Sequence, residues 1–489
     1  MEEESTGVRL CIGFIGHESY RLRDALTPVS QSDSVTVDTC ISPTQHERFS
    51  RAVGDCYLPA ATILLEWLDG GYSLAIGLSG IFTEQLERWR PDALEVFSQV
   101  AAHPRAEVLA TPYHHSIAAL FEDPREYAED IHRHLQLMHD LFHVDCHVMA
   151  DVTGCTPPDV TLHATAQAGL AAVSLPDTAD LLIAASRYHN VSWKNLEILP
   201  RHCRLAEDIA LRFGRRDWDQ HPLTAGKFAG WLAASGGGTV HLLLDLALFG
   251  KVHRRESGIL EFLRSIPDAC TQRGVEGITP STYARAASGL PLPTTPNSAA
   301  ASPATIPLIC LRTMLQHTAF MAVKRAKRLI GGTEVWRILL DSDHFNRMAM
   351  KSGECGSVRG SLTQQQVYEA FASYIRTLAA AEATTAARCP DADGARILCC
   401  LPPEKAFRFS AAGRPAGFSA HSLEEFVDML QFAADDVIAF HTGRNDFARW
   451  IADCLNDPLL AREVKACTGR NELLIVLETR IRALATGLK

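Results

Sequence analysis

Short apolar runs that alternate with amphipathic stretches are the dominant pattern in the first three hundred residues. Apolar residues at 8–15, 72–78, 106–110, 146–152 and 239–245 predict buried strands. The stretches 52–68 and 84–100 predict helices. Between them, Tyr127, Ile131, Leu135, Met138 and Phe142 step by three or four residues, as on one face of a helix. Strands that alternate with helices indicate an α/β fold with a parallel sheet, which could be an incomplete barrel, a full barrel or an open doubly wound sheet.

Further along, the pattern changes twice and divides the chain. Residues 8–290 carry the alternating pattern, and 291–307, rich in Pro, Ser, Thr and Ala, predict a linker or long loop. Residues 308–385 are helical in pattern, and 397–489 predict a separate, mostly helical C-terminal domain. A chain of 489 residues is long enough for two or three such domains.

Composition and charge narrow the class of protein. The chain is 47% hydrophobic and 21% charged, which is typical of a globular protein, and its net charge of −10 argues against a nucleic acid or an anionic membrane as the main partner. No apolar run approaches the ~20 residues of a membrane span, and the acidic start Met1-Glu-Glu-Glu does not resemble a signal peptide. The 14 cysteines show no C-x-x-C spacing, so we expect free thiols, a cytoplasmic location and neither metal nor cofactor.

One region carries a detailed resemblance to a known family. It comprises Leu196–Pro200, Arg204–Phe213, Trp218–Phe228, His241–Gly250 and Glu256–Pro267. In that order, these segments resemble the α-amylase-like branch of glycoside hydrolase family 57, whose lines read Y-R-L-S-D-D-I-A-F-R-F, W-x-E-Y-P-L-T-A-x-K-F, L-F-M-D-Y-E-T-F-G and T-G-I-F-E-F-L-R-x-L-P. The resemblance implies an incomplete parallel (β/α) barrel that acts on or binds an α-glucan or oligosaccharide. It also places the family's catalytic acid/base on Asp245, which we expect to be buried in mid-strand with a raised pKa.

The catalytic nucleophile of the family has no acidic counterpart here. A retaining glycosidase needs two carboxyl groups about 5–5.5 Å apart. Counting forward from Phe142 places Thr153 at the nucleophile position, and counting back from Gly169 places Gly154 there. The nearest carboxylate is Asp151, which lies about one pleat repeat (roughly 6.6 Å) from Thr153 along the predicted strand. The family's Y-E-T after the acid is also replaced by Leu246-Ala-Leu248.

Other positions match the sugar-binding residues of the family. His17 in His17-Glu-Ser19 matches the His of H-Q-P, and His115 matches that of Y-Y-H-S. Leu339-Leu-Asp-Ser-Asp-His-Phe345 resembles L-Q-T-S-D-H-F, which places Asp343 and His344 in the site, whereas G-E-H-Q becomes Gly250-Lys-Val-His253. The C-terminal segment resembles an uncharacterised helical domain (domain family 5752) appended to some carbohydrate-active proteins, which we interpret as a packing module or a surface for a protein partner.

Two functional hypotheses follow from these matches. The first is a catalytically degenerate member, a pseudoenzyme that binds α-glucan or a partner protein without hydrolysing glucan. The second is an active retaining α-1,4-glucan hydrolase or glucanotransferase, with Asp245 as acid/base and Asp151 as substitute nucleophile. A third reading, a scaffold without sugar contact, would require the cleft around His17, His115 and Asp245 to be filled by side chains.

Overall fold

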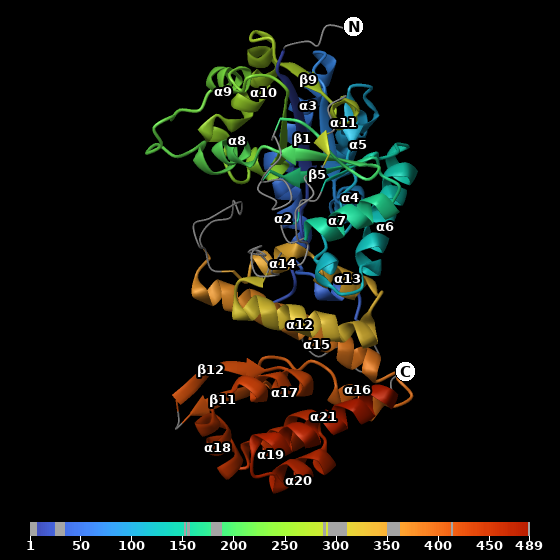
Figure 1. The fold of residues 1–489 in the computed structure, drawn as a ribbon, viewed down its shortest axis with the longest axis vertical. Coiled ribbons are helices and arrows are strands. Elements are labelled where there is room, and N and C mark those ends of the chain that lie inside the picture. The colour runs from blue at the N-terminus through green and yellow to red at the C-terminus, as the bar shows by residue number, and fades with distance from the viewer. Residues whose placement is uncertain are drawn as a thin grey trace.

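The computed structural model describes residues 7–24, 35–150, 153, 157–177, 188–286, 290–291, 311–349, 362–411 and 414–487. The barrel lies at one end of an elongated molecule, the long helices α12 and α15 cross its middle, and the C-terminal domain forms the other end (Figure 1). Asp151, Gly154 and most of the expected linker, 292–307, lie outside the described residues.

Two groups of parallel strands form the barrel. The first has the order β3 (Ala106–Val108), β2 (Leu74–Leu78), β1 (Arg9–Gly16) and β8 (Thr239–Asp245), and β9 (Glu276–Ile278) also pairs with β1. The second has the order β10 (Leu290–Pro291), β6 (Val191–Trp193), β7 (Leu196–Arg201), β5 (Ala172–Pro176) and β4 (Val148–Ala150), in which only the β6–β7 pair is antiparallel. The five predicted strands are therefore confirmed as β1, β2, β3, β4 and β8.

The two groups join at both edges, but unequally. On one side, Ala110 bridges Met149 in parallel, with backbone hydrogen bonds of 2.9 and 2.8 Å. On the other side, the His202 amide donates to the His241 carbonyl (2.8 Å), and His241 Nε2 lies 2.8 Å from Ser174 Oγ. The second junction is not a paired strand ladder among the described residues, so the barrel is incomplete.

The barrel interior is a small core of its own, separate from the larger core outside. Alternate residues of β1 face opposite ways, so Cys11 and Ile15 lie inside, whereas Leu10, Ile12 and Phe14 pack against the surrounding helices. Small residues keep the interior narrow: a Cβ at Gly13 would meet Leu243 Cδ1 at 2.8 Å. The inner core also contains Ala75, Leu109, Val148, Ala150, Ala172, Leu199, Ile278 and Tyr283.

Helices cover the outside of the barrel. The expected helix at 52–68 is present as a π-helical turn, Val53–Tyr57, that leads into α3. The single helix expected at 84–100 is wrong, because Arg90, which precedes Pro91, leaves the helical region (φ −143°, ψ 61°) and separates α4 from α5. The covering helices are α1 (Val37–Cys40), α2 (Gln45–Ala52), α3 (Leu58–Asp69), α4 (Gly80–Trp89), α5 (Pro91–Ala102), α6 (Arg125–Phe142), α7 (Pro158–Gln167), α8 (Cys203–Glu207), α9 (Ala225–Ala233), α10 (Ile259–Thr271) and α11 (Pro280–Arg285).

The helical extension packs across the carboxyl ends of the strands. It contains α12 (Met314–Ile330), α13 (Glu334–Leu339), α14 (Ser342–Asn346) and α15 (Gln364–Ala386). Trp336, Phe345 and Tyr374 are fully buried in the same core as the barrel. The extension is therefore part of the barrel unit in its packing.

The C-terminal residues have a second core. It is built around Phe407, Phe426, Phe447 and Trp450, whose rings pack mostly edge to face. The elements are α16 (Ala392–Ile397), the hairpin β11 (Phe407–Ala411) and β12 (Arg414–Ala420), α17 (Leu423–Phe432), α18 (Asp435–Gly443), α19 (Asp446–Trp450), α20 (Pro458–Ala466) and α21 (Arg470–Gly487). In the described part of the chain, no helix combines the length and the apolarity that a membrane crossing requires.

Candidate functional site

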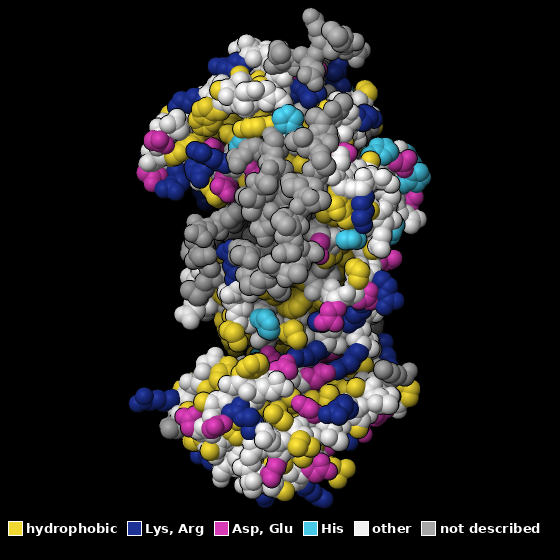
Figure 2. Space-filling model, in the orientation of Figure 1, with side chains coloured by type: hydrophobic (Ala, Val, Ile, Leu, Met, Phe, Trp, Pro, Cys, Tyr) yellow, Lys and Arg dark blue, Asp and Glu magenta, His cyan; other side chains and the backbone are white. Residues whose placement is uncertain are grey.

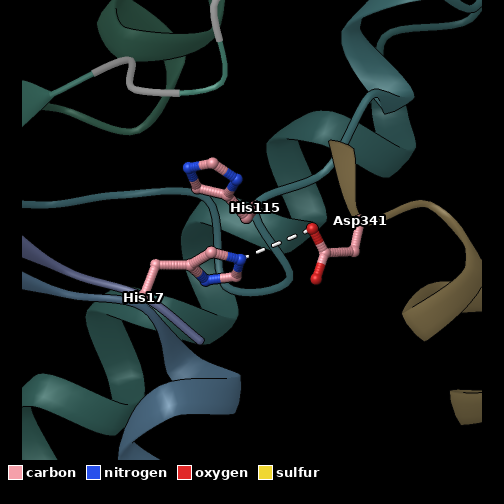
Figure 3. Close-up of side chains that lie close together, drawn as sticks. All are labelled: His17, His115 and Asp341. Carbon is pink, nitrogen blue, oxygen red and sulfur yellow. Dashed lines mark ion pairs between the residues drawn. The ribbon is translucent and has the colours of Figure 1, made fainter. Parts of the chain in front are cut away.

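The predicted site residues converge where the strands of the barrel end. His17 follows the last residue of β1, and His115 lies in the loop that follows β3. The extension brings Asp341 to the same place (Figure 3), and Asp343 and His344 follow it in α14. Carboxyl ends of parallel strands are where α/β folds usually form their sites.

Backbone pairing holds the extension against the barrel loop. Ser116 and Asp341 form an antiparallel bridge. The Ile117 amide donates to the Leu340 carbonyl at 2.8 Å, and the Ser342 amide donates to the His115 carbonyl at 3.0 Å. His115 adopts a left-handed conformation (φ 55°), which a non-glycine residue rarely adopts. The strained residue thus lies where the two segments meet.

His17 is the centre of this polar cluster. Its Nδ1 lies 2.8 Å from Ser79 Oγ, and Ser79 also caps α4 by accepting from the Phe82 amide. Its Nε2 lies 3.4 Å from Asp341 Oδ1 and 3.9 Å from Asp343 Oδ2. The ring stacks on that of His115, with centroids 4.0 Å apart and an angle of 16° between the planes. Figure 3 shows the two rings one above the other, with Asp341 beside them.

The charges of the cluster shift its pKa values in opposite directions. Burial alone would lower the pKa of His17, but the negative charges of Asp341, Asp343 and Glu18 outweigh it and raise the pKa. Burial would raise the pKa of Asp341, but the neighbouring His17 lowers it overall. Burial lowers the pKa of His344 to about 4, so this ring is neutral at pH 7.

Several buried polar atoms of the cluster have no hydrogen-bond partner among the described residues. They are His17 Nε2, Asp341 Oδ2, His344 Nε2 and Asn346 Oδ1. Buried polar groups are nearly always paired, and an unpaired one costs about 1–3 kcal/mol. Such a concentration in one place indicates a site where a polar ligand supplies the missing partners.

Asp245 differs from the expectation. It is the last residue of β8 instead of a mid-strand residue, and it is exposed, so the burial that was to raise its pKa is absent. Its Oδ1 accepts a hydrogen bond from the Ala247 amide at 2.8 Å, which begins the 3-10 turn Leu246–Leu248. The three residues of that turn are buried and apolar. Of the predicted nucleophile positions, Thr153 is described and buried.

A charged pair beside Asp245 was not expected from the sequence. Lys251 forms an ion pair with Glu18, and the Tyr57 hydroxyl donates to Glu18 Oε2 at 3.0 Å. Tyr57 also donates to the His17 carbonyl at 2.8 Å. Glu18 stands at the Gln of H-Q-P and Lys251 at the Glu of G-E-H-Q. The two residues that differ from the family lines therefore contact each other.

Sequence reasoning also missed Ser79, Ser342 and Asp341. Ser79 lies 62 positions from His17, and Ser342 lies 227 positions from the His115 side chain that it contacts. Asp341 had a visible signal, because it stands opposite the Thr of L-Q-T-S-D-H-F. A carboxylate in place of Thr, two residues before the matched Asp343, was therefore a signal in the sequence that Asp341 could belong to the site.

Comparisons with known proteins identify the family and the fold. Residues 12–294 match the model of glycosyl hydrolase family 57. A Methanocaldococcus jannaschii protein named "Putative alpha-amylase" is 33% identical over 223 residues, which are 45% of this chain and 48% of that protein. The chain thus matches about half the length of this curated relative.

Solved structures show the same fold over more of the chain. The branching enzyme of Pyrococcus horikoshii superposes with a TM-score of 0.51 at 11% identity, covering 78% of this chain and 90% of the other. The branching enzyme of Thermococcus kodakaraensis, solved with glucose, gives 0.52 at 11% identity, covering 78% and 89%. The chain belongs to glycosyl hydrolase family 57, because the family model covers more than half of it.

Proposed function

We propose that the barrel binds an α-glucan or oligosaccharide at the carboxyl ends of its strands without cleaving it, so that the chain is a pseudoenzyme of its family. The observation that carries the binding proposal is the buried polar cluster of His17, His115, Asp343 and His344, in which His17 Nε2 and His344 Nε2 have no hydrogen-bond partner among the described residues. Sugar hydroxyls both donate and accept hydrogen bonds, so they can pair with imidazole nitrogens and with a carboxamide oxygen.

The loss of hydrolysis rests on the two carboxyl positions. Thr153, which occupies one of the two positions obtained by counting, offers a hydroxyl in place of a carboxylate. At the other side, Asp245 is exposed and uses a carboxylate oxygen to cap the turn that follows it. Without a carboxylate nucleophile the covalent retaining route is closed.

Hydrolysis is tested by reducing-end release from maltoheptaose and soluble starch. Wild type, Asp245→Asn and Asp151→Asn are compared over hours at high protein concentration. We expect wild type to release no more than either variant. Turnover that disappears in both variants would instead establish the retaining hydrolase or glucanotransferase with Asp151 as nucleophile.

Binding is tested by isothermal titration with maltoheptaose. Asp343→Asn and His344→Gln should weaken binding, because the first removes a negative charge and turns a carboxylate acceptor into an amide donor, and the second replaces the imidazole by a carboxamide of different geometry. His132→Ala is a matched control, since His132 lies on the exposed face of α6. Equal affinity in all four proteins would show that the cluster does not bind the sugar.

A further inference from the structure

We propose that His17, Asp341 and His115 form a binding site for a divalent transition-metal cation of the zinc and cobalt class. The inference goes beyond the proposed glucan binding and does not depend on it. One ligand atom from each residue lies within 4.8 Å of the other two, and all three side chains are buried. Imidazole nitrogens together with a carboxylate oxygen are the ligands that such cations prefer.

The spacing within the cluster fits coordination better than direct pairing. His17 Nε2 and Asp341 Oδ1 are 3.4 Å apart, and His17 Nε2 has no hydrogen-bond partner. A charge-assisted hydrogen bond would bring these atoms to about 2.7–2.9 Å. Two ligands that each lie about 2.0–2.1 Å from one tetrahedral ion are roughly 3.3–3.4 Å apart. The distance between His17 Nε2 and Asp341 Oδ1 therefore matches the distance between two ligand atoms of one tetrahedral ion.

Burial supplies the independent observation. His17 is 8% exposed and Asp341 is 1% exposed, and His17 Nε2 and Asp341 Oδ2 both lack a partner. Asp343 Oδ2, 3.9 Å from His17 Nε2, adds a second negative charge beside them. A cation bound between His17 Nε2 and the Asp341 carboxylate would give the imidazole nitrogen a partner and balance the negative charge of the two carboxylates.

Outer contacts already orient two of the ligands. His17 Nδ1 is engaged by Ser79 Oγ, which leaves Nε2 facing Asp341. Metal-binding imidazoles are typically held through the second ring nitrogen in this way. Asp341 Oδ1 accepts from the Asp343 amide at 2.9 Å, which fixes the carboxylate at the start of α14.

His115 must move to become the third ligand. A ring nitrogen binds a metal in the plane of its ring, so two stacked rings cannot both point at one ion. His115 Nδ1 also lies 2.8 Å from Ser342 Oγ. Metal binding would rotate the His115 ring away from the His17 ring. The hydrogen bond between His115 and Ser342 Oγ would break, and a ring nitrogen of His115 would bind the ion instead.

Asp341 distinguishes this chain from the family line, which has Thr at that position. The added carboxylate is the least exposed residue of the three. The proposed metal site therefore depends on a residue that the resemblance does not supply.

The proposal is tested with cobalt(II) and the metal-free full-length protein at neutral pH. Cobalt reports its ligands by absorption: a four-coordinate nitrogen and oxygen site gives visible bands, whereas thiolate binding adds an intense near-ultraviolet band. This separates the proposed site from the cysteines of the chain. We expect one equivalent to bind with the nitrogen and oxygen signature, and zinc to displace it. Magnesium should not compete, because it prefers oxygen ligands alone.

Variants assign the site. Asp341→Asn and His17→Ala should weaken cobalt binding about tenfold or more, whereas His132→Ala should leave it unchanged. Asp341→Asn retains an oxygen that can cap α14, so it decides the question if His17→Ala fails to fold. No stoichiometric binding, a thiolate spectrum, or equal affinity in Asp341→Asn would overturn the proposal and leave His17 and Asp341 as an ion pair only.

Discussion

At the residue scale, a buried pair next to the site holds its main loop in place. His114 Nδ1 lies 2.5 Å from Asp130 Oδ1, and the His114 amide donates to Asp130 Oδ2 at 3.1 Å. Burial would lower the pKa of His114, but Asp130 and Glu334 raise it to about 9. The pair ties the loop that carries His115 to α6.

Removal of one partner should therefore destabilise the barrel. Asp130→Ala leaves the buried His114 imidazolium with only the half-exposed Glu334, 3.6 Å from Nε2, as its counter-charge, and should lower the free energy of unfolding by about 3–5 kcal/mol. Urea denaturation checks this, with Asp130→Asn as the control that keeps the shape and one acceptor. A loss below 1 kcal/mol in Asp130→Ala would show that the pair does not hold the loop.

Single residues also show where sequence reasoning stops. The match to the family predicted His17, His115, Asp343 and His344 as site residues, and the structure places His17 next to His115 and Asp343. It could not find Ser79 or Ser342, because hydroxyl partners far along the chain follow no local pattern. The mid-strand expectation for Asp245 was wrong because an apolar run does not reveal that its last residue turns outward to cap the next turn.

At the scale of elements, the start of α4 is packed directly on the loop after β3. A Cβ at Gly80 would meet the ring of Tyr113 at 2.3 Å. The Tyr113 hydroxyl donates a hydrogen bond to Glu84 Oε1 at 2.5 Å, which fixes the ring. Gly80 begins the helix right after Ser79, the partner of His17. Close approach of backbone and ring therefore positions both sides of the site.

Gly80→Ala should thus disturb the site as well as the fold. Overpacking against Tyr113 should lower the free energy of unfolding by about 1–3 kcal/mol and weaken maltoheptaose binding. Gly443→Ala in α18 is the matched control, because a Cβ there meets nothing within 4 Å and should be neutral or stabilising by up to about 1 kcal/mol. Similar effects of the two substitutions on unfolding would contradict the packing argument.

The elements themselves were largely readable from periodicity. The apolar runs predicted β1, β2, β3, β4 and β8, since strands buried on both faces are apolar without interruption. Periodicity could not separate a barrel from an open sheet, because closure depends on the Ala110–Met149 and His202–His241 contacts between strands distant in sequence. It also missed the break at Pro91, where the apolar pattern continues through two helices.

At the scale of the whole molecule, the C-terminal domain meets the barrel unit through charged contacts. Arg325 pairs with Asp428, Arg328 pairs with Glu424, and Arg376 pairs with Glu404. Figure 2 shows basic and acidic side chains gathered where the two parts meet. We propose the domain limits 8–290 with the extension 308–385, which share one core, and 397–489, which has another, and we propose 397–489 as the unit that contacts a protein partner.

One buried acid at this junction should make the stability of the protein depend on pH. Glu382 of α15 is 1% exposed and accepts from the Cys400 amide at 2.7 Å. Burial raises its pKa from 4.5 to about 7, against the opposing effects of that hydrogen bond and Arg328, while Glu424 adds to the rise. Cys399 and Cys400 face the same carboxyl group.

The protonated form of Glu382 is favoured in the folded state, so the contribution of this group to stability is highest at low pH. It should fall as pH rises from about 4.5 to 7, by about 3 kcal/mol for this group. Glu382→Gln removes the titration and keeps an acceptor for Cys400. Denaturation of both proteins at several pH values should show a difference that grows over this interval and then stays constant. A difference independent of pH would contradict this account.

The central claim is that the site binds glucan without cleaving it, and one measurement addresses both halves. Maltoheptaose is titrated into wild type in a calorimeter, and the sugar recovered from the cell after a long incubation is analysed by chromatography. The account predicts saturable heat with one site per chain and intact maltoheptaose. Shorter or longer maltooligosaccharides in the cell would establish an active enzyme, and an absence of heat would contradict binding.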